Sequence, residues 1–303
     1  MTIDSVDPDD VDAADILGSA IERREDPALV TGNAEYTDDI ELPNTAHMAI
    51  LRSQYAHATI EDVDTEDAEA MDGVLGVFTH EDLAREDTPG NLPFLVPVAW
   101  QLPSLNDVNH PMLADGRVRY QGDAIAAVVA EDRAVARDAL DAVDVDYERR
   151  EAVTSPSDAL DGDAPGLHGE ADGNVAFDWE IGDEEKTDDA FADADRVVEF
   201  EADNQLLIPN AMEPRACVAD YNPGSDDLEV FMTTQNPHVH RLLLSGVLDH
   251  PEHKLRVKAP DVGGGFGSKI HNYADEAIAA WAAKHLERPV KWVATRSETY
   301  LTD

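Results

Sequence analysis

Acidic residues outnumber basic residues almost threefold in this 303-residue chain, 65 against 22, which leaves a net charge of −43. Any fold of the chain must keep most of these carboxylates in solvent, and repulsion excludes a phosphate-backbone partner such as nucleic acid. The 43% of hydrophobic residues still predicts a folded core beneath an acidic surface. Because concentrated salt shortens the Debye length to about 3 Å near 1 M, the charge favours a halophilic source.

The cysteine count limits the redox chemistry that the chain can supply. Cys217 stands alone, so it can form no internal disulfide and cannot provide the four thiolates of an iron–sulfur cluster. In its apolar stretch we interpret it as a small buried hydrophobe. The acidic first residues lack the apolar segment of a signal peptide, and no run of 18 apolar residues could span a membrane. We therefore expect a cytoplasmic protein without a membrane span.

Periodic segments separate the chain into two folded parts. We predict an acidic mobile tail at 1–17, a first domain at 18–154, a linker rich in Pro, Gly and Asp at 155–173, and a second, incomplete domain at 174–303. The mixture of strands and helices predicts an α+β fold. Strands are predicted at Ala46–Arg52, Val74–Phe78, Ala124–Ala130, Val143–Tyr147, Arg196–Glu201, Leu228–Thr233 and Val290–Ala294, and helices at His80–Arg85, after the N-cap Asp132, and around Ile278, Trp281, Ala282 and Leu286.

A glycine-rich run, DVGGGFGSK at Asp261–Lys269, carries the strongest local signal. Four glycines in five positions indicate positive φ angles or a backbone that another group must approach closely. A P-loop is a poor match, because Ser268 precedes Lys269 and Ile270 follows it, and Ser268 fits a dinucleotide fingerprint only loosely. On local pattern alone, a tight strand-to-helix connection and a ligand-facing loop both remain open.

Other polar residues give weaker signals. His238 and His240 stand two apart, as on one face of a strand, but no third ligand follows at a usual zinc spacing, which favours a surface or packing role. Carboxylate pairs such as Asp38–Asp39 and Asp188–Asp189 are too common in this chain to identify a catalytic pair. The sequence therefore assigns no catalytic residue and no metal ligand.

Several blocks, in order from Leu17 to Asp303, closely resemble the molybdenum-binding large subunit of the xanthine dehydrogenase and aldehyde oxidase family, carbon monoxide dehydrogenase large chains included. The glycine run is one of them, and their joint occurrence is more specific than any single motif. The others are REDPALVTG at Arg24–Gly32, RSQYAHA at Arg52–Ala58, VRYQGDAIA at Val118–Ala126, MEPR at Met212–Arg215, TQNPHVHR at Thr234–Arg241 and PVKWVATRSE at Pro289–Glu298.

The resemblance implies an α/β hammerhead domain at 18–154, followed by the first portion of a molybdopterin-binding domain. It also implies that the glycine run lies against a molybdenum-molybdopterin cofactor in its cytosine dinucleotide form. Gln235 would donate to an oxo group of the molybdenum, Phe266 and Gly267 would approach from the other side, and Gly264 and Gly265 would permit the approach. A valine at Gly265 is then expected to point against the cofactor and block its retention.

The reaction implied by the resemblance is oxidative hydroxylation of an aldehyde-type substrate or carbon monoxide. Ile270, where xanthine-specific members carry a glutamate, makes a purine substrate less suitable. Electrons would pass to an iron–sulfur small subunit and a FAD-binding medium subunit, which hold those cofactors. Because family large subunits are more than twice as long, the catalytic glutamate and the rest of the pocket are expected on a C-terminal half supplied as a partner.

Two alternatives belong to other classes of function. A non-catalytic remnant or assembly module of such a complex would fold in the same way without turning over substrate. Nucleotide binding by the glycine run is disfavoured, because both phosphate-binding motifs fail.

Overall fold

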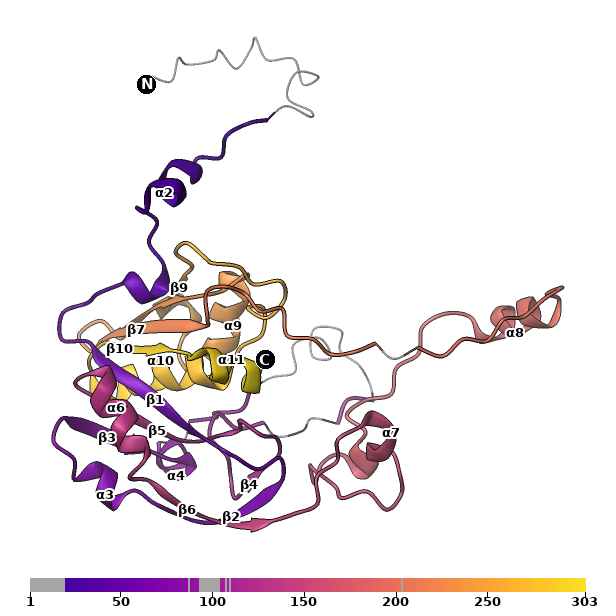
Figure 1. The fold of residues 1–303 in the computed structure, drawn as a ribbon, viewed down its shortest axis with the longest axis horizontal. Coiled ribbons are helices and arrows are strands. Elements are labelled where there is room, and N and C mark those ends of the chain that lie inside the picture. The colour runs from indigo at the N-terminus through magenta and orange to yellow at the C-terminus, as the bar shows by residue number, and fades with distance from the viewer. Residues whose placement is uncertain (1–19, 87, 93–103, 107, 109, 203) are drawn as a thin grey trace. The chain divides into compact units, whose positions relative to one another are not determined.

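The computed structural model describes residues 20–86, 88–92, 104–106, 108, 110–202 and 204–303 (Figure 1). The chain divides into two compact units, 1–35 and 36–303. The predicted acidic tail at 1–17 lies outside the described residues. In the first unit, helix α2 (Asp26–Thr31) has proline in its first turn and ends on Gly32 at φ +73°, a left-handed position that glycine adopts without strain.

The larger unit is a mixed α/β structure built on a seven-stranded sheet in the order β3-β5-β1-β10-β7-β8-β9. Strands β1 and β10 are parallel, as are β8 and β9, whereas the remaining neighbours are antiparallel. The β1–β10 pair joins a strand near the start of this unit to one near the chain's end. The strands are β1 (Ala46–Arg52), β3 (Val74–Phe78), β5 (Ala124–Ala130), β7 (Ala216–Asn222), β8 (Asp227–Met232), β9 (Leu255–Lys258) and β10 (Val290–Val293).

Helices cover both faces of this sheet. On β1, Met48 packs into the core that contains α10 (Ala274–Leu286), whereas its neighbour Ala49 packs with Ala136 of α6 (Arg133–Leu140). Alternate residues of a strand point to opposite faces, so α10 and α6 lie on opposite sides. Strand β5 is buried at all seven positions, which explains its continuous apolar sequence.

The remaining helices are short, and most lie in connections between strands. They are α3 (Glu66–Glu69), α4 (His80–Arg85), α7 (Pro156–Ala159), α8 (Glu184–Ala192), α9 (Pro237–Val247) and α11 (Arg296–Thr302), with single 3-10 turns at Thr37–Asp39, Asp172–Asn174 and Glu252–Lys254. Within the described residues, no helix combines the length and the apolar character needed to cross a bilayer.

Most of the predicted elements are confirmed, including the N-cap role of Asp132, whose carboxylate accepts from the amides of Ala134 and Val135. The strand predicted at Arg196–Glu201 is wrong, because this segment has no strand partner among the described residues. The strand proposed for His238 and His240 is also wrong: both lie on helix α9, whose Pro237 occupies the first turn.

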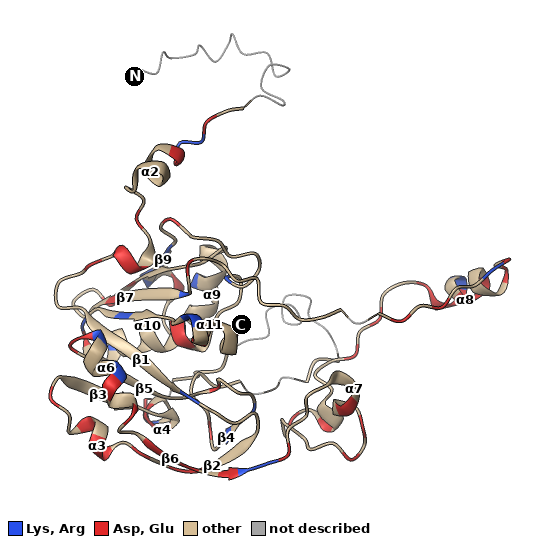
Figure 2. Ribbon diagram, viewed as in Figure 1, with Lys and Arg blue, Asp and Glu red and all other residues tan. Residues whose placement is uncertain are grey.

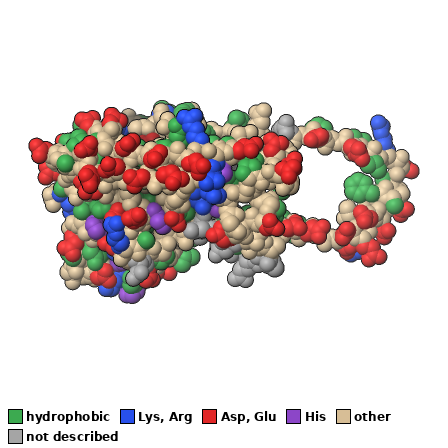
Figure 3. Space-filling model, turned by 90° about the horizontal axis from the view of Figure 1, so that it is seen from below, with side chains coloured by type: hydrophobic (Ala, Val, Ile, Leu, Met, Phe, Trp, Pro, Cys, Tyr) green, Lys and Arg blue, Asp and Glu red, His purple; other side chains and the backbone are tan. Residues whose placement is uncertain are grey.

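A second, three-stranded sheet has the order β4-β2-β6, with β2 (Ala58–Asp64), β4 (Arg117–Val118) and β6 (Asp144–Arg149). One face of β2 and β6 is apolar, since Val63 lies opposite Val145. The other face is acidic, and Asp62 lies directly opposite Asp146. Like charges that face each other across a strand pair destabilise it. Asp and Glu positions are distributed along the ribbon in Figure 2, and acidic side chains spread over the face of the molecule shown in Figure 3.

We predict that Asp146→Asn stabilises the protein at low salt, by roughly 0.2–1 kcal/mol, because it removes the repulsion from Asp62. The gain should disappear in 2 M KCl, where the Debye length falls to only a few Å. Urea-unfolding midpoints at both salt concentrations measure the effect. Glu148→Gln is the control: Glu148 lies opposite Thr59 and pairs with Arg150, so no low-salt gain is expected. Equal gains at both salt concentrations would contradict the electrostatic explanation.

Candidate functional site

The glycine-rich run forms the connection between β9 and α10, and its backbone is unusual. Gly264 and Gly267 have φ angles of +97° and +108°, and Phe266 has φ +55°. A bulky residue in the left-handed region is an outlier that costs on the order of 1–3 kcal/mol. Phe266 is also 76% exposed, so its own burial does not offset this strain. Strain held in this way clusters at functional sites, which favours the ligand-facing interpretation of the loop over a plain connection.

The structure brings Gln235 directly against this loop. Its side-chain carbonyl Oε1 accepts hydrogen bonds from the amides of Gly267, at 3.0 Å, and Lys269, at 3.3 Å. Its own backbone amide donates to the carbonyl of Lys269 at 2.9 Å. Because Oε1 is engaged by the loop, the side-chain Nε2 is the part of the Gln235 amide that remains able to donate to another group.

At two of the glycines, neighbouring protein atoms occupy the space that a side chain would need. A Cβ at Gly265 would lie 2.3 Å from Gln235 Oε1, and a Cβ at Gly263 would lie 2.5 Å from Glu213 Cβ. At Gly267, by contrast, nothing lies within 4 Å of that position. The missing side chain at Gly265 therefore makes room for Gln235.

The Glu213 carboxylate bonds to both ends of the loop. Glu213 Oε2 accepts from the Gly263 amide at 2.7 Å and from Lys269 Nζ at 2.9 Å. Lys269 is 2% exposed, and its burial lowers the pKa of its ammonium group even though Glu213 raises it. A buried lysine normally requires a partner of this kind. Glu213 thus holds the loop in the shape in which Gln235 reaches it.

Three consecutive backbone amides of the loop donate no hydrogen bond to the described residues. The N–H groups of Gly264, Gly265 and Phe266 donate to no group among the residues that the structure describes. Successive backbone amides in turns with left-handed residues form concave sites that bind anionic groups. Together with Gln235 Nε2, they form a set of hydrogen-bond donors without an acidic or basic side chain. The set suits an anionic cofactor held by position and hydrogen bonds.

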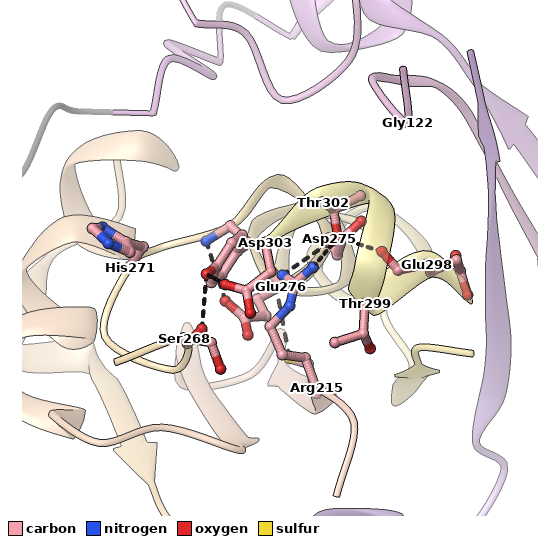
Figure 4. A network of polar contacts seen from close by, with 12 residues as sticks. Gly122, Arg215, Ser268, His271, Asp275, Glu276, Glu298, Thr299, Thr302 and Asp303 are labelled. Atoms are coloured by element: carbon pink, nitrogen blue, oxygen red, sulfur yellow. Dashed lines mark hydrogen bonds and ion pairs between the residues drawn. The ribbon is translucent and has the colours of Figure 1, made fainter. Parts of the chain in front are cut away.

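A buried ion network lies beside the loop (Figure 4). The Asp275 carboxylate, at the start of α10, lies 2.6 Å from Arg52 Nη2 and 3.1 Å from Arg215 Nη1. Burial alone would raise the pKa of Asp275, but the two guanidinium groups outweigh it and hold the pKa below its usual range. Arg215 also stacks on Tyr273, 3.6 Å from the ring centroid, and the Tyr273 hydroxyl donates to the Ser268 carbonyl. The network therefore connects strand β1 to the glycine loop.

Glu276, the next residue of α10, behaves in the opposite way. Burial, assisted by the Asp275 carboxylate and opposed by Arg215, raises the pKa of Glu276 to about 8. Its Oε2 accepts from the Tyr273 amide at the start of the helix, a role that survives protonation of the other oxygen. The fully buried side chain is therefore neutral at pH 7.

We predict that Glu276→Gln changes the pH dependence of stability. Unfolded Glu276 titrates near 4.5 and folded Glu276 near 8, so the folded state holds an extra proton between these values. The free energy of unfolding must then fall as pH rises through this window, by on the order of a few kcal/mol. Glutamine keeps the helix-capping acceptor but cannot ionise. Urea unfolding in 2 M KCl should show that the free energy of unfolding of the variant rises relative to that of the wild type between pH 5.5 and pH 8.5. Parallel pH profiles for the two proteins would contradict a raised pKa of Glu276.

The surroundings of His238, His240 and Cys217 do not indicate a metal site. His240 is buried, with Nδ1 2.6 Å from Thr234 Oγ1 and Nε2 2.8 Å from the carbonyl of His271, whereas His238 is exposed. Their side chains belong to no group of three potential metal ligands among the described residues. The packing role of His240 is confirmed, and Cys217 is buried and unpaired as expected.

Sequence reasoning missed the roles of three acidic residues at this site. Glu213 belongs to the MEPR block at Met212–Arg215, which gave it no role, and no motif identified Asp275 or Glu276. The available signal was positional: the pair lies in the first turn of a largely apolar helix that follows the glycine loop. In a chain with 65 acidic residues this signal is weak, because most acidic residues lie in solvent.

Comparison with known families assigns both parts of the chain. Residues 31–151 match the a/b hammerhead domain of aldehyde oxidase and xanthine dehydrogenase, and residues 167–303 match the molybdopterin cofactor-binding domain. The fold and the site thus define a chain that joins a hammerhead domain to a molybdopterin-binding domain, with the glycine loop in the second.

Individual relatives agree with this assignment. The chain is 37% identical to the carbon monoxide dehydrogenase large chain of Afipia carboxidovorans, over 98% of this chain and 37% of the relative, and 35% identical to the nicotine 6-hydroxylase large subunit of Paenarthrobacter nicotinovorans, over 94% and 34%. It therefore belongs to the xanthine dehydrogenase, aldehyde oxidase and carbon monoxide dehydrogenase family of molybdopterin-binding large subunits, and it spans about a third of their length.

Solved structures give the same result. A crystal structure of Cu,Mo-CO dehydrogenase matches with a TM-score of 0.83 and 36% identity, over 93% of this chain and 36% of that chain. Quinoline 2-oxidoreductase from Pseudomonas putida 86 matches with a TM-score of 0.82 and 34% identity, over 93% and 35%. The expected resemblance and fold class are confirmed.

Proposed function

We propose that this chain is the N-terminal portion of the large subunit of a molybdenum hydroxylase. The observation that carries the proposal is the arrangement at the loop: Gln235 Oε1 is fixed by the amides of Gly267 and Lys269, which leaves Nε2 able to donate. The uncommitted amides of Gly264–Phe266 lie in the same loop. This donor set fits one side of a molybdopterin cofactor, with Gln235, Gly264, Gly265, Phe266 and Gly267 as the residues that hold it.

The bound cofactor would supply the redox chemistry, and this chain would supply position and hydrogen bonds. Gln235 would donate from Nε2, in an orientation set by the loop. Glu213 and Lys269 would keep the loop in shape by joining its two ends. No residue of the chain is assigned as a catalytic acid, base or nucleophile, because the catalytic glutamate implied by the family resemblance would lie on the remaining part of the subunit.

The reaction we propose is oxidative hydroxylation of an aldehyde-type substrate or carbon monoxide. Ile270, beside Lys269, offers no hydrogen bond to a purine. Electrons would pass to an iron–sulfur subunit and a FAD-binding subunit, because the buried Cys217 of this chain cannot ligate a cluster by itself. The C-terminal remainder of the large subunit is a further necessary partner.

Four finer points complete the proposal. The cofactor would be the cytosine dinucleotide form. The boundary between the hammerhead and cofactor-binding domains would fall at 155–173, which fits the family matches at 31–151 and 167–303. The organism would be halophilic, in agreement with a net charge of −43, and the protein would be cytoplasmic.

The test is to express the chain in high salt with the C-terminal remainder and the two smaller subunits from the same genome. We expect about one molybdenum and one pterin per large subunit, and turnover of carbon monoxide or a member of an aldehyde panel. A complex that assembles without molybdenum or pterin would reject the enzyme and leave the assembly-module alternative. The chain without its partners provides the baseline for metal content.

A further inference from the structure

The segment 196–208, between α8 and β7, exposes large apolar side chains to solvent. Their exposed fractions run from 50% at Val197 to 101% at Leu206. The other residues with large exposed side chains in this segment are Val198, Phe200 and Leu207. Such a concentration is unusual on a folded surface, where contiguous apolar patches mark sites that another molecule covers.

The backbone of this segment is also unpaired. None of the amide and carbonyl groups of 196–202 and 204–208 bonds to another described residue. These residues belong to the coloured coil between α8 and β7 in Figure 1. A flexible linker would expose its backbone in the same way, but linkers are poor in β-branched and aromatic residues. This segment combines exposed backbone groups with the side chains of a buried strand.

The local pattern specifies a strand rather than a helix. Val198 and Phe200 alternate with Glu199 and Glu201, which places the apolar pair on one face and the carboxylates on the other. Extended segments of this type bind by adding a strand to an exposed sheet edge: main-chain hydrogen bonds give the affinity, and alternate side chains enter the partner's core. The sequence pattern of Arg196–Glu201 therefore suits a strand, although the segment is not a strand among the described residues of this chain.

No described strand of this chain pairs with the segment. The cofactor-binding domain match begins at residue 167 and so includes the segment, yet the strands of that domain present here do not cover it. The solved relative at 36% identity has almost two-thirds of its chain beyond the part matched here. At low salt a second copy of this chain is a poor occupant, because each copy carries a net charge of −43 and the two would repel each other.

We propose that residues 196–208 dock as an added β-strand on the C-terminal remainder of the large subunit, an inference that rests on the proposed function. The segment is then a fixed part of the interface that completes the cofactor-binding domain. Apolar side chains around Val198 and Phe200 enter the core of the remainder, and the carboxylates of Glu199 and Glu201 stay in solvent.

The first test is hydrogen exchange of the backbone amides, with the C-terminal remainder from the same genome as the probe. In the chain alone the amides of 196–202 and 204–208 should exchange at the rate of an unstructured peptide. On binding, alternate amides should slow by at least 100-fold. Self-association of the chain with protection of the segment in the absence of the remainder would identify a second copy as the occupant and overturn the proposal.

Two variants separate strand addition from other contacts. Val198→Ser with Phe200→Ser removes the apolar face, and Glu199→Pro removes an amide donor while keeping both apolar side chains. Each should weaken binding of the remainder at least tenfold without lowering the melting temperature of the chain alone, since these side chains are exposed. Leu160→Ser, at a site 67% exposed outside the segment, is the matched control and should bind normally.

The outcomes distinguish this inference from the function on which it rests. If the genome encodes no remainder, or if the wild-type chain does not bind it, the proposed function fails. If the remainder binds and the complex retains molybdenum while 196–208 stays unprotected, only the docking inference fails. Loss of binding with the double serine variant, without alternate protection of the segment's amides in the wild-type complex, would show apolar contact without strand pairing, which also overturns the proposal.

Discussion

Replacing Gly265 with alanine is expected to remove most of the molybdenum from the assembled enzyme. The new Cβ would lie 2.3 Å from Gln235 Oε1, a separation at which one of the two groups must move. The amides of Gly267 and Lys269 both depend on that oxygen, so the change breaks the bonds that join Gln235 to the loop. We expect at least a tenfold loss of molybdenum per large subunit, measured by mass spectrometry of the metal.

The chain alone provides a second measurement that does not depend on the cofactor. Hydrogen exchange at Gly267 and Lys269 should accelerate in Gly265→Ala, because their acceptor is displaced. Gly246→Ala is the matched control, since this helical glycine has nothing within 4 Å of a Cβ and no positive φ. Normal metal content in Gly265→Ala, together with unchanged exchange, would show that the Gln235 contact does not hold the loop.

Asp275→Ala is expected to have the largest effect on stability. The substitution leaves the buried Arg215 without this carboxylate and leaves Arg52 with Glu298 as its remaining partner. Removal of one member of a buried ion pair typically costs about 3–5 kcal/mol, a large fraction of the roughly 5–15 kcal/mol that stabilises a domain. Urea unfolding followed by circular dichroism in 2 M KCl should show a strongly lowered midpoint or no folded protein.

The control for this prediction is an ion pair of the same type on the surface. Glu252→Gln removes the carboxylate that pairs with Arg241, where both side chains are over 40% exposed, and should leave the midpoint almost unchanged. If Asp275→Ala unfolded at the same urea concentration as Glu252→Gln, the network would have no role in stability.

The sequence was informative where local pattern and final environment coincide. Seven consecutive apolar residues predicted β5, and the structure buries all of them. The carboxylate of Asp132 caps α6 by a local rule that needs no tertiary information. The pairing of the glycine loop with Gln235 came from the family resemblance, because nothing in the intervening residues indicates that the two segments meet.

Other features depend on contacts that no local pattern reports. The Glu213–Lys269 pair joins residues 56 positions apart, and Asp275 meets Arg52 from a distance of 223 positions. The strand face expected for His238 and His240 is a helix in the structure, and Pro237 at the first helical turn is the signal that indicates it. At 196–201 the β pattern is clear, but a pattern alone cannot supply the neighbouring strand that it requires.

The central place of β10 in the seven-stranded sheet has a consequence for synthesis. Strands β3, β5 and β1 leave the ribosome early, but β1 receives its parallel partner only when Val290–Val293 emerges, and β10 also bridges to β7. Until then the nascent chain carries two incomplete half-sheets with open hydrogen-bonding edges, which are prone to pair with other chains. Closure of the seven-stranded sheet therefore awaits β10, and a ribosome that stalls before residue 290 would release an aggregation-prone polypeptide.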